Sequence, residues 1–299
     1  MKKMLIILLF IFSLCLVSCG QDSEEETTYL SEDEIKTKLA TMAEKANNSE
    51  IVLPDCYELT IKTQQKFGND GLLYIDYSYK YVIDKENKIF YVDVKIKDKM
   101  FTIDQNNVNF NTPANLYYCQ IWIYPENNEL VVAINDNNSR TYETMSLEFF
   151  ESQVNEAYTK IKYDVLGFEI NLQTPENMMV QLNYEINSLM DEETCYYTTK
   201  PEGITHVLDY KVTSSKEGFL DAKIIHSLQG RDEKGDASSV KYDYAFTIEN
   251  DIPIKINSLV EHKNAFVPYM SYLYAYSEYN LLINNYSCSF PNLQDYIKI

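Results

Sequence analysis

The residues best able to do chemistry in this chain are its six cysteines and three histidines, and Cys19 stands out by its position. It ends an apolar stretch over residues 4–17 that follows two lysines, and residues 16–20 read LVSCG. A thiol can take a lipid as a thioether, and small neighbours leave the preceding peptide bond open to a peptidase. We therefore predict that Cys19 is a lipidation site.

The same residues resemble the signal peptide and lipobox of bacterial lipoproteins. A charged start and a short apolar run are typical of a secretory signal, and the run is shorter than the roughly 20 residues of a membrane-spanning helix. The resemblance implies cleavage after Ser18, a diacylglycerol on Cys19 and often acylation, for example by palmitate, of the new amino terminus. Stable attachment needs more than one acyl chain, which such a cysteine carries. The alternative is an ordinary secreted protein that is cut elsewhere.

This interpretation divides the start of the chain into a signal peptide, residues 1–18, and a lipid-anchored tether, residues 19–30. Residues 21–28 read QDSEEETT, a stretch too polar to fold by itself. We expect the protein at the cell membrane or elsewhere in the cell envelope, facing outside the cytoplasm.

The remaining thiols and imidazoles have no spacing that indicates catalysis or metal binding. Cys56, Cys119, Cys195 and Cys288 are far apart in sequence, so two disulfides or four free thiols are both open. The histidines are His206, His226 and His262, and none pairs at the helical spacing of a zinc site. We predict no catalytic residue, no metal site and no cofactor.

The composition of the chain limits the classes of partner that we expect it to bind. With 45 acidic and 26 basic residues the formal net charge is −19, which disfavours nucleic acid and anionic headgroups. A soluble acidic surface is one explanation, and capture of a cationic partner is another. The 26 tyrosines against 8 glycines favour sheet and disfavour phosphate-binding loops.

Residue periodicity predicts an α+β fold of antiparallel β-meander sheets packed with a few helices. Ser31 and Glu34 form a capping box, and the apolar spacing that follows predicts a helix over residues 32–47. Period-two alternation predicts a hairpin over 73–83 and 90–97, and a second over 117–124 and 130–135. Further helices are predicted from Ser146 and from Pro175, each with an apolar stripe: Phe149, Gln153, Val154, Ala157, Tyr158 and Ile161, then Met178, Met179, Leu182, Ile186 and Leu189.

The order of helix, meander and helix occurs twice, which predicts a tandem pseudo-repeat of residues 31–173 and 174–299. The strand over 115–124 aligns with the strand over 239–249. Their inward sets correspond: Tyr117, Cys119, Ile121 and Ile123 align with Tyr242, Tyr244, Phe246 and Ile248. On the opposite face, Tyr118, Trp122 and Tyr124 form an aromatic patch that either binds a ligand or is covered by a helix.

Element order in an exported, lipidated chain also resembles the LolA/LppX group of lipid-handling lipoproteins, in which a sheet and helix enclose an apolar cavity. The leading hypothesis is a non-enzymatic binding or scaffolding lipoprotein of unknown ligand or surface protein partner. The resemblance implies an alternative, a carrier of lipid or another apolar ligand. A second alternative is a surface hydrolase with a carboxylate site.

Overall fold

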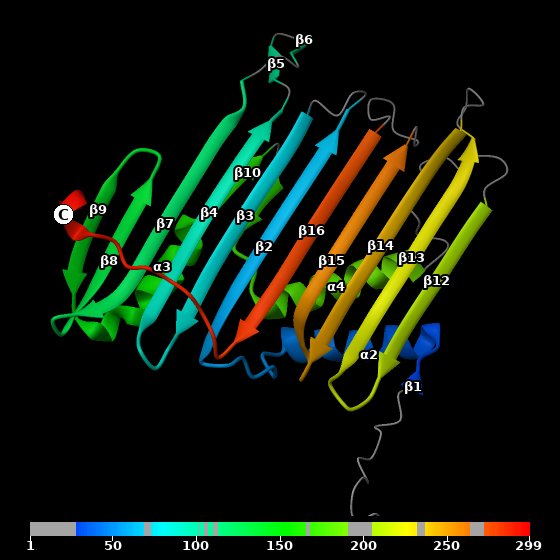
Figure 1. Ribbon diagram of the computed structural model, residues 1–299, viewed down its shortest axis with the longest axis horizontal. Coiled ribbons are helices and arrows are strands. Elements are labelled where there is room, and N and C mark those ends of the chain that lie inside the picture. The colour runs from blue at the N-terminus through cyan, green and yellow to red at the C-terminus, as the bar shows by residue number, and fades with distance from the viewer. Residues whose placement is uncertain are drawn as a thin grey trace, which may run out of the picture.

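A computed structural model describes residues 28–68, 73–100, 102–104, 107–109, 113–165, 168–190, 205–231, 237–263 and 272–299. They form one sheet of 13 strands in the order β1-β12-β13-β14-β15-β16-β2-β3-β4-β7-β8-β9-β17, with helices on one face (Figure 1). Its neighbouring strands are antiparallel apart from β17, which runs parallel to β9.

The sheet strands from the first half of the chain are β1 (Thr28–Tyr29), β2 (Cys56–Phe67), β3 (Leu73–Asp84), β4 (Ile89–Lys99), β7 (Asn115–Glu126), β8 (Glu129–Asp136) and β9 (Arg140–Met145). Those from the second half are β12 (Thr205–Ser214), β13 (Leu220–Arg231), β14 (Ala237–Glu249), β15 (Ile252–Lys263), β16 (Tyr272–Ile283) and β17 (Ile297–Lys298). Two small pairs lie outside this sheet: β5 (Thr102–Asp104) with β6 (Asn107–Asn109), and β10 (Lys162–Val165) with β11 (Phe168–Asn171).

The helices are α2 (Glu32–Asn47), α3 (Phe150–Lys160) and α4 (Pro175–Met190), with short 3-10 turns η1 (Leu147–Phe149) and η2 (Leu293–Asp295). Within the described residues, no helix combines the length and the apolar character needed to cross a membrane.

The predicted fold class is wrong in its architecture, because the chain is β-rich and builds one large sheet rather than tandem α+β units with separate sheets. Strands β16 and β2 pair in continuous register from Leu273 opposite Phe67 to Ile283 opposite Tyr57. This pairing satisfies two rows of backbone groups that separate meanders would leave exposed at their edges. The boundaries of the two repeats stay a prediction, but their strands share one sheet.

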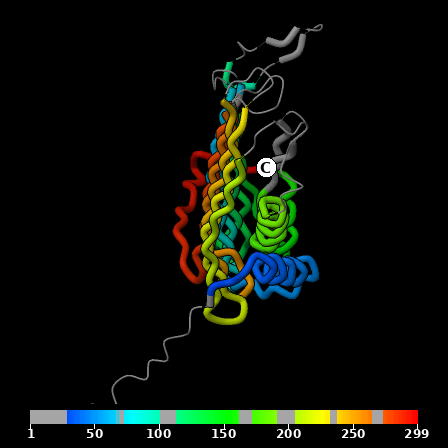
Figure 2. The backbone as a smooth tube through the Cα atoms, turned by 90° about the vertical axis from the view of Figure 1, so that its right-hand side faces the viewer, coloured from blue at the N-terminus to red at the C-terminus, as the bar shows by residue number. Residues whose placement is uncertain are grey.

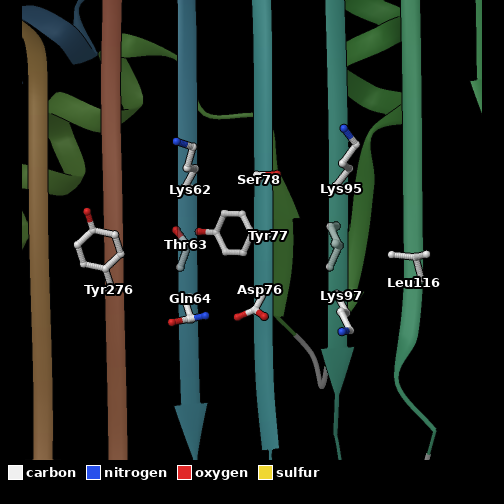
Figure 3. A pocket seen from close by; sticks show the side chains of 11 residues that line it. Lys62, Thr63, Gln64, Asp76, Tyr77, Ser78, Lys95, Lys97, Leu116 and Tyr276 are labelled. Atoms are coloured by element: carbon white, nitrogen blue, oxygen red, sulfur yellow. The ribbon is translucent and has the colours of Figure 1, made fainter.

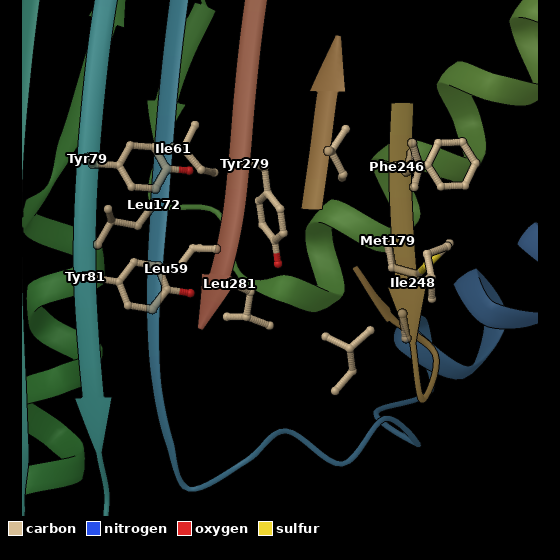
Figure 4. Close-up of a cluster of buried hydrophobic side chains, with 14 of the residues drawn as sticks. Leu59, Ile61, Tyr79, Tyr81, Leu172, Met179, Phe246, Ile248, Tyr279 and Leu281 are labelled. Atoms are coloured by element: carbon tan, nitrogen blue, oxygen red, sulfur yellow. The ribbon is translucent and has the colours of Figure 1, made fainter. Parts of the chain in front are cut away.

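The three α-helices cover the same face of the sheet and bury the main core against it (Figures 1 and 2). The predicted stripe of α2 is buried throughout, and the Glu34 carboxylate accepts a 2.8 Å hydrogen bond from the Ser31 backbone N–H. Both predicted inward sets belong to this core, which continues around Tyr79, Tyr81 and Met179 (Figure 4). In α3 the predicted stripe is off at its start, because Phe149 lies in the 3-10 turn, 47% exposed, and Phe150 is buried instead.

The opposite face carries a second, smaller core at the β9 end. Trp122, Tyr124, Val131 and Ala133 are buried there with Leu293 and Tyr296 packed against them. The cover is the C-terminal strap, residues 284–299, which crosses this face and ends as β17 beside β9 (Figures 1 and 2). The predicted helical cover of the aromatic patch is therefore wrong, because the segment that covers it follows the last long strand and forms only a 3-10 turn and the short strand β17, without an α-helix.

Polar contacts fix the strap along its course. The Glu58 carboxylate accepts hydrogen bonds from the Ser287 backbone N–H and the Lys80 ammonium, both at 2.9 Å. Farther along, the Trp122 indole N–H donates to the Ser289 carbonyl at 2.9 Å. The strap is thus held at one end by hydrogen bonds between Ser287 and the Glu58–Lys80 ion pair of the sheet, and at the other by aromatic packing.

Candidate functional site

Cys19, the predicted lipidation site, lies outside the described residues, so its modification stays a prediction. Cys195 also lies outside them. Cys56, Cys119 and Cys288 carry free thiols, and burial raises the pKa of each. Thiols with raised pKa values are poor nucleophiles near neutral pH, so these three cysteines do not indicate a reactive site.

The three histidines, which are distant in sequence, lie on one sheet face near the same end. The rings of His206 and His226 meet at 4.5 Å between centroids, and Tyr242 separates His226 from His262. His226 is fully buried, and burial lowers the pKa of His262. No group of three or more histidine, cysteine, aspartate or glutamate side chains in the described part of the chain is arranged to hold a metal ion.

A row of hydroxyl side chains crosses the helix-covered face of the sheet. Strand register places five residues in line on β14, β15, β16, β2 and β3. They form the hydroxyl row: Tyr244, Ser258, Ser277, Thr63 and Tyr77. The adjacent row of the same face is largely apolar and contains Phe246, Ile256 and Ile61, so the hydroxyl row is a polar band within the main core.

The small side chains in the middle of the hydroxyl row leave space beneath α4. The resulting α4 cleft has a volume of about 180 Å³ and is lined on the helix side by Met178, Gln181, Leu182 and Glu185. Met178 belongs to the predicted apolar stripe but is only partly buried, because it faces this space. In the floor, the hydroxyl groups of Thr63 and Ser277 share a hydrogen bond of 3.0 Å.

Glu185 is the carboxylate of the α4 cleft. Its side chain accepts a 2.7 Å hydrogen bond from the Gln181 amide and another from the Tyr244 hydroxyl. Burial nevertheless raises its pKa, because removal from water penalises the charged form more than these two donors stabilise it. The described residues that line the cleft include no lysine, arginine or histidine, so the carboxylate has no cationic partner there.

A second hollow lies on the opposite, open face of the sheet, over strands β16, β2, β3, β4 and β7. It has a volume of about 330 Å³ and is lined by Tyr276, Lys62, Asp76, Lys95, Lys97 and Leu116, among others (Figure 3). The side chains of Lys62 and Lys95 are 60% and 61% exposed, so water screens their charges. This hollow is shallow and solvated, whereas the α4 cleft is more enclosed and brings polar groups together around a partly buried carboxylate. We therefore take the α4 cleft as the candidate site.

Comparison with known proteins adds nothing to this geometry. The chain matches no protein-family model, no curated protein and no solved structure. The resemblance to the LolA/LppX group thus has no support from these comparisons.

Proposed function

We propose that the protein is a lipoprotein, anchored to a membrane through lipid on Cys19 and facing outside the cytoplasm, that acts as a non-enzymatic binding module. The observation that supports binding is the α4 cleft, where Gln181, Glu185 and the hydroxyl row converge. Enclosed hollows with a few convergent polar groups and a carboxyl of shifted pKa are typical of ligand sites.

The apolar carrier fits the structure less well. The face under the helices is filled by the main core, and the space left there is about 180 Å³, below the roughly 300–1,000 Å³ of pockets for drug-sized ligands. The lining of that space is also rich in hydroxyl and amide groups, which an acyl chain would leave without hydrogen bonds.

The hydrolase alternative also lacks support from the cleft. Glycoside hydrolysis uses two carboxyl groups on either side of the scissile bond. Glu185 is the single carboxylate among the described residues that line the α4 cleft. Binding of a small ligand, with no covalent chemistry, is therefore the function that we assign to this site.

The membrane anchor is tested by a cysteine exchange in a bacterial host that lipidates its own lipoproteins. Cys19→Ser should move the protein from the membrane fraction to the soluble fraction, because a hydroxyl cannot form the thioether. Cys15→Ser is the matched control, since it removes a thiol from the same apolar stretch and should leave the protein on the membrane. Retention of Cys19→Ser in the membrane fraction would contradict the anchor.

A further inference from the structure

We infer that the α4 cleft binds a small organic cation, held by the Glu185 carboxylate and the hydroxyl row. The inference rests on the proposed binding function and adds the chemical class of the ligand. Three features of the cleft lead to it: an uncompensated carboxylate, a polar floor between aromatic walls, and a limited volume.

The carboxylate gives the charge of the ligand. Glu185 is partly buried, and an ionised carboxylate that is partly removed from water is stabilised when it is paired with a cation. Glu185 accepts hydrogen bonds from Gln181 and Tyr244, yet no basic side chain lines the described cleft. A bound cation would supply the missing partner, whereas an anion would meet a second negative charge in the same space.

The floor and walls of the cleft indicate which other chemical groups the ligand carries. Ser258, Ser277 and Thr63 present hydroxyl groups that accept and donate hydrogen bonds. Tyr77 and Tyr244 stand at the two ends of the hydroxyl row, and aromatic side chains attract cations at their ring faces. A cation that also carries a hydroxyl group would match both features.

The volume gives the size of the ligand. About 180 Å³ corresponds to roughly six water molecules at about 30 Å³ each in the liquid. That is space for a small amine or quaternary ammonium compound and excludes a peptide or an oligosaccharide. The net charge of −19 adds a long-range attraction that raises the local concentration of cations.

Isothermal titration of the detergent-solubilised lipoprotein with choline tests the inference. The matched probe is 3,3-dimethyl-1-butanol, which has the same shape and hydroxyl group but no charge. We expect one choline per chain and at least about tenfold weaker binding of the neutral probe, because that probe lacks the attraction of a positive charge to the Glu185 carboxylate and to tyrosine ring faces. Choline binding should weaken on acidification, because protonation removes the charge of Glu185. The other titratable groups of the described lining are the phenols of Tyr77, Tyr244, Tyr276 and Tyr279, and burial raises the pKa of Tyr77 and Tyr279.

Variants locate the binding. Glu185→Gln keeps the shape and should weaken choline binding at least tenfold, whereas Glu176→Gln removes a charge from the same helix outside the lining and should change it less than twofold. Ser258→Leu fills the floor and should also abolish binding. A thermal unfolding scan checks that each variant is folded; Glu185→Gln should unfold no earlier than the wild type at pH 7, because a carboxyl with a raised pKa destabilises the fold when ionised.

The outcomes are distinct. Equal binding of choline and its neutral isostere, or binding that Glu185→Gln does not change, would overturn the cation assignment but leave a binding protein. Absence of choline binding in the folded wild type would also overturn the cation assignment. The membrane anchor is tested separately by fractionation of Cys19→Ser, and the choline titrations do not bear on it.

Discussion

Trp122→Ala should lower the free energy of unfolding by about 3–5 kcal/mol, the range for removal of a large buried aromatic side chain. Trp122 is 6% exposed and contacts Tyr91 and Tyr296, with ring centroids 5.4 and 6.3 Å away. Its indole N–H also donates to the Ser289 carbonyl of the strap. The substitution therefore opens a cavity and releases the strap at the same time, and urea unfolding measures the loss.

Phe290→Ala is the matched control for Trp122→Ala. Phe290 belongs to the strap and contacts Tyr124 at 4.5 Å between ring centroids, but it is 48% exposed. Its removal should cost clearly less than that of Trp122, because much of its surface already faces water. Equal effects of the two substitutions, or a loss below about 1 kcal/mol for Trp122→Ala, would contradict the strap as a structural cover.

Tyr81→Ala should be comparably damaging, with a loss of about 3–5 kcal/mol. Tyr81 is fully buried in the main core, and its ring contacts Tyr57 and Tyr158 at 5.9 Å and Phe90 at 6.4 Å between centroids. Its hydroxyl donates to the Gln173 carbonyl at 3.1 Å, just before α4 begins. The ring therefore supports both the sheet and the entry to the helix above the α4 cleft.

Tyr81→Phe separates these two contributions. It keeps the ring and removes a hydroxyl that is hydrogen-bonded to the Gln173 carbonyl and to the hydroxyl groups of Tyr57 and Tyr158, so the expected loss is about 1–3 kcal/mol. The Gln173 backbone stays attached through its N–H, which donates to the Tyr79 hydroxyl at 2.9 Å. Chemical unfolding of both variants measures the difference. A loss for Tyr81→Phe as large as that for Tyr81→Ala would mean that the hydroxyl, and not the ring, carries the stability.

Local structure in this chain was predictable because its causes are local. The capping box at Ser31 and the apolar spacing after it are sufficient to set the start and the buried face of α2. The second predicted hairpin is confirmed, with Asn127 and Asn128 both at positive φ in the turn between β7 and β8. Asparagine tolerates that conformation better than most residues, so the turn could be predicted from the sequence.

The single sheet was not predictable, because alternation shows which side chains share a face and not which strands pair. Nothing in the residues of β16 or β2 indicates that the two strands pair, and they are more than 200 residues apart in sequence. The strap was missed for a related reason. Nothing in the sequence of the strap indicates which strands it covers, although its Phe290 contacts Tyr124 and its Tyr296 contacts Trp122 on the open side of the sheet.

The α4 cleft depends on the same long-range register. The hydroxyl row takes one residue from each of five strands, and single serines or threonines in alternating strands carry no signal of their own. Glu185 lies among many acidic residues and looks like part of a solvated helix face. Burial between α4 and the sheet raises its pKa, even though the hydrogen bond from Tyr244 acts in the opposite direction, and that burial depends on how α4 packs on the sheet.

Native mass spectrometry of the lipoprotein extracted from its membrane tests the central claim, a small polar binding site rather than a lipid cavity. We expect a mass equal to the chain and its anchor, without a second lipid, that increases by one choline when choline is added. A stoichiometric lipid beyond the anchor, retained after gentle extraction, would contradict it, because the about 180 Å³ of the α4 cleft cannot hold one.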